Sequence, residues 1–577
     1  MYVEKVPNRN SPPAILLRES KREGRRIRKR TLANLSDWPA EKVEALRRLL
    51  KGETLVSVDE VFSIERSVPH GHVEAVLRMI RKLGLDRLIA SRCCRERDLV
   101  IAMIAEQLIY PCSKLATTRL WHTTTLAEEL GVGDADEDDL YEALDWLLAR
   151  QERIEKKLAR RHLVDGSLVL YDVTASHYEG HTCPLVRFGR KRYGKPGKPI
   201  IIYGVLCDDD GRPIAAQVYP GNTGDPSTVP EQVEKLRDCF GLSRVILVGD
   251  RGMLTETQVR HLKKHPGVGW ISALRNASIR KLVEDGHLQM SLFDEQNLAE
   301  ITSPEYPGER LVVCKNPLLA EERRRKRDEL VGMTEKDLAR ISREVARRTR
   351  KPLDRGEIGL KVGKVIGHYK MGKHFNLTIE DGVFRWSRDE ESIREEAALD
   401  GIYVIRTSEP EERLSAEDVV RSYKSLSRVE RLFRTLKGID LRVRPIRHRT
   451  EAHVRAHIFL CVLAYYVEWH MREALRSLLF DDEDLDEDRK RRDPVAPARS
   501  SESARKKKAK RVTSDGLSIH SFETLLKELG TCCRNRCRMK SDTSGSTFTE
   551  MTQRTSLQSR VLQLLDLYPV GGNSLSR

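Results

Sequence analysis

Four short apolar runs in the middle of the chain constrain its fold more than any other feature. They are SLVLYDVT at 167–174, IIYGVLCD at 201–208, PIAAQVYP at 213–220 and RVILVGD at 244–250. Each has the length and the β-branched content of a strand, and the turn residues Asp209, Asp210 and Gly211 separate the second from the third. A helical pattern at 229–241 precedes the fourth run, and another follows it. The order strand, strand, strand, helix, strand, helix predicts an α/β fold.

The chain on either side of these runs has a different periodicity. Before them, apolar residues recur at helix spacing in 72–85, 99–109 and 139–159. After them, strand-like pieces surround a highly charged helix, and helical periodicity returns at 415–437. We therefore expect an RNase H-like core that follows a helical N-terminal region and is interrupted by a β-rich insertion. The expected divisions are 1–160 for a helical N-terminal DNA-binding region, 161–265 for the first part of the core, 266–400 for the insertion, 401–480 for the second part of the core, 481–513 for a charged linker and 514–577 for a C-terminal tail unit.

The charge balance indicates a polyanionic partner. Lys and Arg total 103 against 87 Asp and Glu, a formal net charge of +16, and nucleic acid is the commonest partner of so basic a chain. The basic run between 14 and 32 suits contacts with DNA phosphates. Its candidate DNA-binding residues are Arg18, Lys21, Arg22, Arg25, Arg26, Arg28, Lys29 and Arg30. RNA-binding proteins usually present aromatic strands, and only 6% of this chain is aromatic.

Compartment and metal chemistry are constrained by what the sequence lacks. No run of 18 uninterrupted apolar residues occurs, and the first residues contain no apolar signal segment, so we expect no membrane span and no secretory signal. Eleven scattered cysteines indicate reduced thiols in a cytoplasm. Cys532, Cys533 and Cys537 lack the second cysteine or histidine pair of a zinc site, so zinc is disfavoured.

Three acids stand out by position. Asp172 lies in the first strand-like run, Asp250 ends the fourth, and Glu430 lies within a helical pattern. Two divalent cations about 3.5–4 Å apart can activate the attacking oxygen and stabilise the leaving oxygen in phosphodiester chemistry. Mg²⁺ prefers oxygen ligands, so carboxylates suit it better than Cys or His. These acids are the candidate metal ligands.

The helical pattern around Glu430 predicts one functional stripe. Tyr423, Leu426, Glu430 and Lys437 are separated by helical intervals, so a single helix would present them on one face. That face could direct Glu430 at the metals and place Tyr423 and Lys437 against DNA. An ordinary charged surface helix remains the alternative on spacing alone.

The motifs YDVT, VGDRGM and the helix with Tyr423, Glu430 and Lys437 resemble the catalytic motifs of insertion-sequence DDE transposases. The resemblance is to the insertion-sequence-four-like superfamily, in the branch with a long insertion between the second Asp and the Glu. It extends over the segments GNTGDPST and LRVRPIRHRTEAHVRAH and covers roughly residues 10 to 480. The family's Arg in the helix motif would fall at Leu426, and Arg428 or Arg431 is the available substitute.

The resemblance implies a fold, an activity and a set of partners. It implies an RNase H-like catalytic domain with two Mg²⁺ or Mn²⁺ ions and with Asp172, Asp250 and Glu430 as catalytic residues. It implies double-stranded DNA as partner, both the terminal inverted repeats and the target, and action as a homo-oligomer. The residues expected to contact DNA are Tyr423, Lys437, Arg251, Arg428, Arg25, Arg26, Arg28, Lys29 and Arg30.

Two alternatives to a transposase stay open at this stage. A stand-alone RNase H-like nuclease would share the three acids without needing the long insertion. An inactive, transposase-derived DNA-binding protein would have lost an acid, and none is replaced here. A zinc site at His448, His453 and His457 is disfavoured, because no Glu of an HExxH motif lies between the last two; packing and DNA contact are favoured for these rings.

Overall fold

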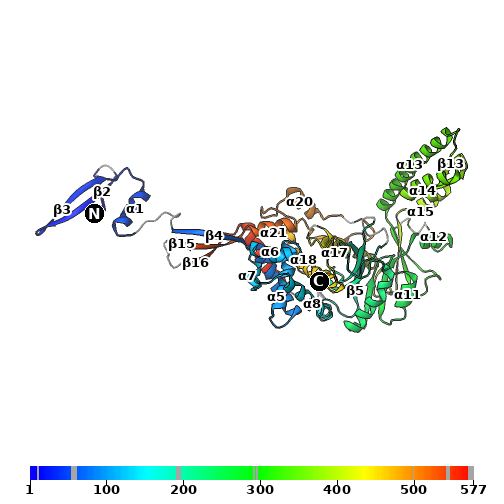
Figure 1. The fold of residues 1–577 in the computed structure, drawn as a ribbon, viewed down its shortest axis with the longest axis horizontal. Coiled ribbons are helices and arrows are strands. Elements are labelled where there is room, and N and C mark those ends of the chain that lie inside the picture. The colour runs from blue at the N-terminus through cyan, green and yellow to red at the C-terminus, as the bar shows by residue number, and fades with distance from the viewer. Residues whose placement is uncertain are drawn as a thin grey trace. The chain divides into compact units, whose positions relative to one another are not determined.

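A computed structural model describes the chain except for 10–11, 54–60, 190–196, 290–292, 294–295, 439, 498, 541–545 and 570–577. The chain divides into two compact units (Figure 1). Unit 1 comprises Met1–Pro69 and Cys532–Gln553, and unit 2 comprises His70–Thr531 and Arg554–Arg577. Unit 1 therefore combines segments from both ends of the sequence, and unit 2 combines the middle of the chain with its last residues.

Unit 1 consists mainly of strands. Strands β1 (Tyr2–Val6), β2 (Ala14–Glu23) and β3 (Arg26–Asn34) form an antiparallel sheet, followed by helix α1 (Ala40–Leu50). A second sheet has the order β16 (Thr547–Met551), β15 (Cys533–Met539), β4 (Phe62–Pro69). The expectation that residues 1–160 are helical is wrong for this part. The basic run is a hairpin instead, because Gly24 adopts a φ of 61° and turns the chain between β2 and β3.

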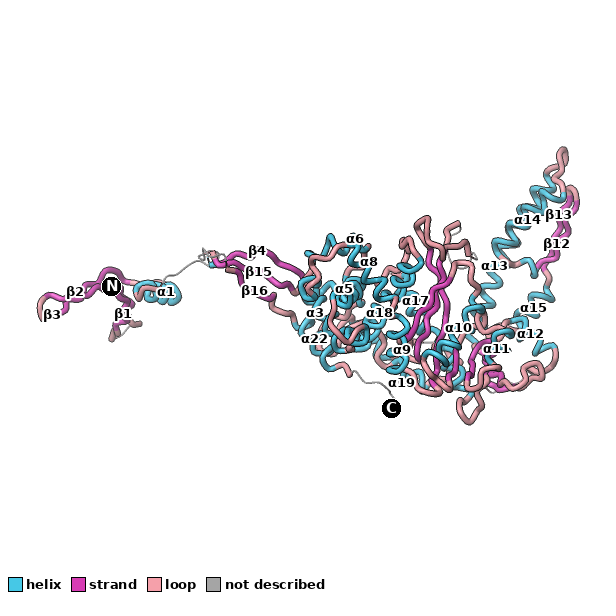
Figure 2. Tube along the Cα trace, turned by 60° about the horizontal axis from the view of Figure 1, so that its bottom comes forward, coloured by secondary structure: helices cyan, strands magenta, loops and turns pink. Residues whose placement is uncertain are grey.

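The core of unit 2 is an eight-stranded sheet with the order β10-β11-β14-β9-β8-β5-β6-β7. Strands β5, β6 and β7 are antiparallel neighbours, while β8 and β9 run parallel to β5. This is the RNase H-like arrangement expected from the sequence. The strand bounds are β5 (Ser167–His177), β6 (Ile200–Asp208), β7 (Pro213–Tyr219), β8 (Val245–Val248) and β9 (Val268–Ala273). Figure 2 shows helices on both sides of these strands.

The segment expected to be a β-rich insertion is mixed in structure. Its first strand, β9, is part of the core, and β10 (Leu298–Ile301) and β11 (Arg310–Lys315) extend the same sheet through β14 (Ile402–Thr407). Isolated apolar runs do not reveal which sheet they join, so the boundary at residue 266 was wrong. The remainder is dominated by helices and has a small core of its own around Leu338 and Ile358. Its elements are α12 (Asn276–Glu284), α13 (Pro317–Arg347), α14 (Arg355–Tyr369), β12 (Phe375–Glu380), β13 (Val383–Arg388) and α15 (Glu390–Ala398).

Helix α18 (Glu451–Ala474) is buried along most of its length and connects the helical part of unit 2 to the sheet. It packs against α3, α5 and α8 on one side and against β7 and α17 on the other. The helices before the sheet are α3 (Gly71–Lys82), α4 (Leu85–Ile89), α5 (Arg95–Ile109), α6 (Lys114–Leu120), α7 (Leu126–Leu130), α8 (Glu137–Leu148) and α9 (Gln151–His162). Those within or after it are α10 (Val229–Glu234), α11 (Glu256–Leu262), α16 (Ala416–Lys424) and α17 (Leu426–Lys437).

The linker and the tail are integrated into this structure. The linker contains α19 (Leu485–Arg491) and α20 (Glu502–Lys510), and it buries Val495 and Ala504. The segment expected to be a charged linker therefore contributes two small apolar side chains to the buried interior. The tail helices α21 (Phe522–Gly530) and α22 (Ser556–Leu567) pack against α3.

The burial of α22 predicts that the tail stabilises the whole of unit 2. Leu565 is 0% exposed, whereas Leu567 in the same helix is 67% exposed. Leu565→Ala should lower the free energy of unfolding by about 2–5 kcal/mol, because it removes buried methyl groups and leaves a cavity. Leu567→Ala is the matched control and should have almost no effect. Equal denaturation curves for the two variants would show that α22 is not part of the core.

Candidate active site

Asp172 and Asp250 are brought together by the pairing of two parallel strands. Ser167 to Leu170 of β5 pair with Val245 to Val248 of β8, ending at Leu170↔Val248. Two further residues on each strand give Asp172 and Asp250, so the same register sets these acids side by side and on the same face. At the opposite end, Asp165 accepts hydrogen bonds from the Ser243 amide (2.8 Å) and hydroxyl (2.6 Å). The two strands are thereby held in one register.

The backbone after β8 orients the Asp250 carboxylate. Its Oδ1 accepts hydrogen bonds from the amides of Gly252 (2.8 Å) and Met253 (2.7 Å). A Cβ at position 252 would lie 3.3 Å from Oδ1 and 3.4 Å from Oδ2. Glycine thus permits the tight approach that fixes this carboxylate.

Glu430 reaches the site from α17, which packs against β5. The buried side chains Val429, Leu432 and Phe433 attach the helix to the sheet, with the Phe433 ring edge-on to Tyr203 at 6.0 Å. Glu430 lies on the exposed side of the helix. Its charge nevertheless contributes to the electrostatics of Asp172, so this acid lies near the aspartates and is open to solvent.

Negative charge accumulates around Asp172. Burial, together with the charges of Asp250, Glu430 and Asp225, raises the pKa of Asp172 to about 7, against a hydrogen bond from the Val173 amide. Asp225 belongs to the GNTGDPST segment and had not been singled out in the sequence. A bound cation would stabilise such a group of ionised acids. Three carboxylates offer the hard oxygen donors that divalent cations prefer, so the site fits a metal.

The three acids do not form one tight cluster. Among the described residues, the acids whose ligand oxygens all lie within 4.8 Å of one another are Asp208, Asp209 and Asp210, in the β6–β7 turn. Arg212 pairs with Asp208 at 2.5 Å and with Asp210 at 2.8 Å. Arg212 thus offsets part of the negative charge of that turn.

Tyr423 and Lys437 both lie beside the acids. Burial raises the pKa of Tyr423 to about 12, and the charges of Asp250, Glu430 and Asp172 add to the rise while Arg251 opposes it. Lys437 donates a hydrogen bond to the Thr174 hydroxyl, two residues beyond Asp172. Tyr423 is on α16 and Lys437 on α17, so the single helix expected from the spacing is two helices that meet at Ser425. Helical spacing alone could not reveal that break.

Comparison with known proteins was decisive. The family model described as transposase DDE domain matches residues 165–467, which span β5 to α18 and include all three acids. The chain belongs to the transposase DDE domain family. The model of the IS1634 family transposase N-terminal domain matches residues 3–59. The chain is thus a DNA transposase, an enzyme that breaks and joins phosphodiester bonds with divalent metal ions.

No curated protein matches the chain. Among solved structures, the cryo-EM structure of a piggyBac transposase synaptic complex with hairpin DNA is similar to it at 10% identity, with a TM-score of 0.34. That similarity covers 88% of this transposase and 84% of the other chain.

The arginines proposed for DNA contact have different surroundings. Arg251 is exposed beside Asp250. Arg428 instead pairs with Asp486 of the linker at 3.0 Å, and Arg431 pairs with Asp481 at 2.7 Å. Leu426, at the usual arginine position of the family, packs against the main hydrophobic core. Each of the two substitute arginines is therefore paired with an acid in this structure.

The cationic hairpin of unit 1 is exposed along its length. Arg25 occupies the turn, and β3 carries Arg26, Arg28, Lys29 and Arg30, all of them exposed. Lys29 pairs with Glu4 at 3.2 Å, and Arg28 with Glu23 at 3.5 Å. The excess of cations remains available to a polyanion.

The histidines and cysteines singled out in the sequence are packed side chains. His453 stacks on Tyr141 at 4.8 Å, and His448 lies 4.7 Å from the His457 ring. All eleven cysteines are free thiols, and Cys532 and Cys537 are buried. Within the described part of the chain, no group of metal-ligating side chains includes these histidines or cysteines.

No single described helix is long and apolar enough to cross a membrane. The segments Arg95–Ile109 and Lys114–Thr123, bent by 91° to each other, meet the criteria of length and composition only when they are taken together.

The tight approach at position 252 predicts a specific defect. Gly252→Ala should displace the Asp250 carboxylate by a few tenths of an ångström and reduce DNA cleavage by less than the roughly 100-fold that a misplacement of about 1 Å can cost. Gly363→Ala in α14 is the control, since a Cβ there meets nothing within 4 Å. Cleavage rates should be compared at matched thermal stability. Wild-type cleavage by Gly252→Ala would show that this contact does not position Asp250.

Proposed function

We propose that this transposase binds the terminal inverted repeats of its element and, with Asp172, Asp250 and Glu430 holding two Mg²⁺ or Mn²⁺ ions, cleaves the ends and transfers them to target DNA. It would act on nucleoid DNA in the bacterial cytoplasm, as a homo-oligomer, because two ends must be joined to one target. The single observation that carries the catalytic assignment is the β5–β8 register. It sets two acids side by side, at a place where the charge of Glu430 also acts on Asp172.

The residues of the site have separate roles in this proposal. The three carboxylates bind cations, which when bound would lower the barrier to attack at phosphorus and stabilise the leaving oxygen. Lys437 lies beside Thr174 and presents a positive charge close to Asp172, where a DNA phosphate would be held. Tyr423 offers a hydroxyl and an aromatic ring next to the same acids. Arg251, exposed beside Asp250, is suited to a phosphate of the same strand.

The acids can be tested individually. Asp172→Asn, Asp250→Asn and Glu430→Gln should each abolish cleavage of end DNA while leaving DNA affinity nearly unchanged, because each removes a metal ligand and little volume. The exposed acid Glu412, in the loop before α16, provides the control Glu412→Gln. Cleavage is measured on labelled duplexes.

Two outcomes would contradict the catalytic assignment. A folded acid variant that retains end cleavage would remove that residue from the site. Full cleavage in EDTA, where Mg²⁺ should be required to restore activity, would contradict the metal mechanism. A stand-alone nuclease is distinguished by the products, since it would cut DNA but form no strand-transfer joints in a plasmid assay.

The hairpin of unit 1 is proposed to contact the DNA backbone at the element's ends. Replacing Arg25, Arg26, Arg28, Lys29 and Arg30 by Gln should weaken binding and reduce its salt dependence, by a log–log slope of about 0.9 for each lost phosphate contact. Neutralising the exposed α13 cations Arg324, Arg325 and Lys326 is the control. If only the α13 changes altered binding, DNA contact would lie in the insertion. Truncation near residue 160 is unsuitable, because it strips α3, α5 and α8 from α18.

A further inference from the structure

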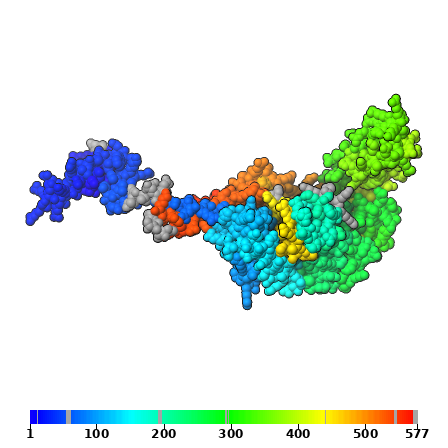
Figure 3. All heavy atoms as spheres, viewed as in Figure 1, coloured from blue at the N-terminus to red at the C-terminus, as the bar shows by residue number. Residues whose placement is uncertain are grey.

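A cationic cavity lies between the first turn of α6 and the segment that connects α17 to α18. Its volume is about 330 Å³. None of its lining residues carries a carboxylate. The cationic and imidazole side chains that line it are Lys114, Arg442, Arg444, Arg447, His448 and His457. The exposed yellow atoms in Figure 3 include the segment after α17. A cavity whose charged lining side chains are all cationic is suited to an anion.

Lys114 is the decisive residue of this cavity. It is 5% exposed, and no hydrogen bond or ion pair of its ammonium group is found among the described residues. The nearest acid, Glu106, is itself buried; burial raises the pKa of Glu106 to about 7, and its carboxylate accepts a hydrogen bond from the Cys112 thiol. Burying an unpaired cation is costly. The cost would be offset by an anion that enters the cavity.

The wall opposite Lys114 is held in place by the core. Leu441, Val443 and Ile446 are buried, so the arginines between them face outward. The Val443 amide donates to the Leu436 carbonyl (2.9 Å) and the Ile446 amide to the His177 carbonyl (3.2 Å). The fixed backbone presents a row of arginines to the cavity mouth.

This wall connects the cavity to the active site. The Arg444 Nε donates to the Lys437 carbonyl at 3.1 Å, and the Lys437 ammonium group binds Thr174 next to Asp172. Burial, together with the charges of Lys114 and His453, lowers the pKa of His448 to about 3. The His448 ring is therefore neutral near pH 7 and can donate one N–H group without adding charge.

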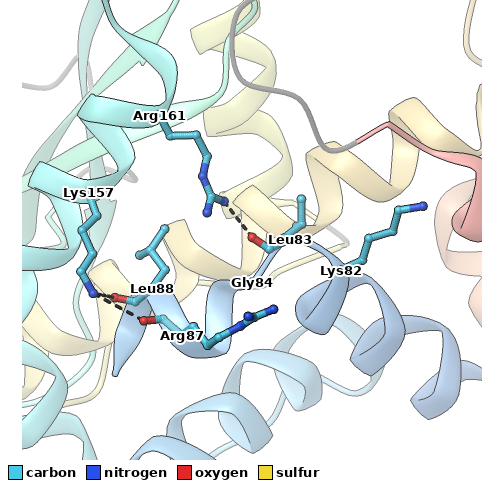
Figure 4. A pocket seen from close by; sticks show the side chains of 7 residues that line it. All are labelled: Lys82, Leu83, Gly84, Arg87, Leu88, Lys157 and Arg161. Carbon is cyan, nitrogen blue, oxygen red and sulfur yellow. Dashed lines mark hydrogen bonds between the residues drawn. The ribbon is translucent and has the colours of Figure 1, made fainter. Parts of the chain in front are cut away.

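A second cationic pocket differs from the Lys114 cavity, because cations that line it bind backbone carbonyls of the protein. It is lined by Lys82, Arg87, Lys157 and Arg161 (Figure 4). There Lys157 donates to the Leu88 carbonyl (2.7 Å) and Arg161 to the Leu83 carbonyl (2.8 Å). Lys157 and Arg161 therefore donate hydrogen bonds to backbone carbonyls near the ends of helices, and both cations already have partners within the protein. Lys114 has no such partner in the described chain.

We propose that the Lys114 cavity binds one phosphate of the DNA strand whose cleaved bond lies at Asp172 and Asp250, and so positions that strand. The ligand is a backbone phosphodiester, bound by charge and hydrogen bonds without reading the base. The inference rests on the proposed function, because it takes DNA to be the substrate at the three acids.

The test compares two charge removals on one helix. Lys114→Met removes the buried cation, whereas Arg119→Met removes an exposed cation of α6 that does not line the cavity. For the full-length chain binding a DNA duplex, Lys114→Met should reduce the log–log salt slope by about 0.9, the value for one phosphate contact. Arg119→Met should leave the slope unchanged, and Lys114→Arg should retain it. Equal slopes for Lys114→Met and wild type would overturn the proposal.

Neutral phosphates on the DNA locate the contact. A methylphosphonate placed at successive positions should weaken wild-type binding at one position near the cleaved bond, and Lys114→Met should be insensitive at that position. The thermal midpoint of Lys114→Met should not fall, because the variant loses an unpaired buried charge. If inorganic phosphate binds at Lys114 but does not compete with DNA, the cavity is a site for a small anion and the proposal is wrong. The acid variants test the proposed function separately, since they should bind DNA and fail to cut it whatever the cavity does.

Discussion

The parallel pairing of β5 with β8 is the constraint on which the rest of the active site depends. Period-two alternation means that a shift of one residue would turn Asp172 and Asp250 to opposite faces of the sheet. Asp165 opposes that shift at one end by binding Ser243, and buried apolar residues fill the strands between. The site is therefore built on two neighbouring strands in the interior of the sheet, which suits groups that must hold their positions against their own repulsion.

Charge placement follows from this rigid arrangement. Several acids lie around Asp172 and raise its pKa. Cations lie nearby, at Lys437 and in the segment from Arg442 to Arg447. At other places, opposite charges pair within the protein. The acidic linker provides Asp481 and Asp486 to Arg431 and Arg428, which removes these arginines from the exposed positive surface. The cations Lys437 and Arg444 lie next to the catalytic residues, where a strand of DNA would pass.

The long segment between Asp250 and Glu430 is partly core and partly an added lobe. Strands β10, β11 and β14 continue the sheet edge beyond β9, while α13, α14 and the β12–β13 hairpin form a separate small core. The C-terminal tail is likewise no appendage. Strand β15 pairs with β4 of unit 1, and α22 packs against α3 of unit 2. Sequence distance is thus a poor guide to the parts of this transposase that fold together.

The sequence by itself determined the α/β core and the order of its first strands along the chain, and it marked the three acids as candidate metal ligands. These features are local: apolar runs of strand length, turn residues beside them, and carboxylates at the positions that motifs mark. Local patterns also carried the family resemblance, which the match over 165–467 supports. The sequence could not place β9 in the core sheet, separate α16 from α17, or show that the basic run is a hairpin.

Only the tertiary structure decided which charges are satisfied and which strands share a sheet. Arg428 looked suited to DNA but pairs with Asp486, 58 positions away. Lys114 looked unremarkable in the sequence but is buried beside the arginines after α17. Neither fact has a local signature, because pairing and burial depend on contacts between residues that are far apart in the chain. Local patterns specify which elements form, and long-range packing specifies what each side chain meets.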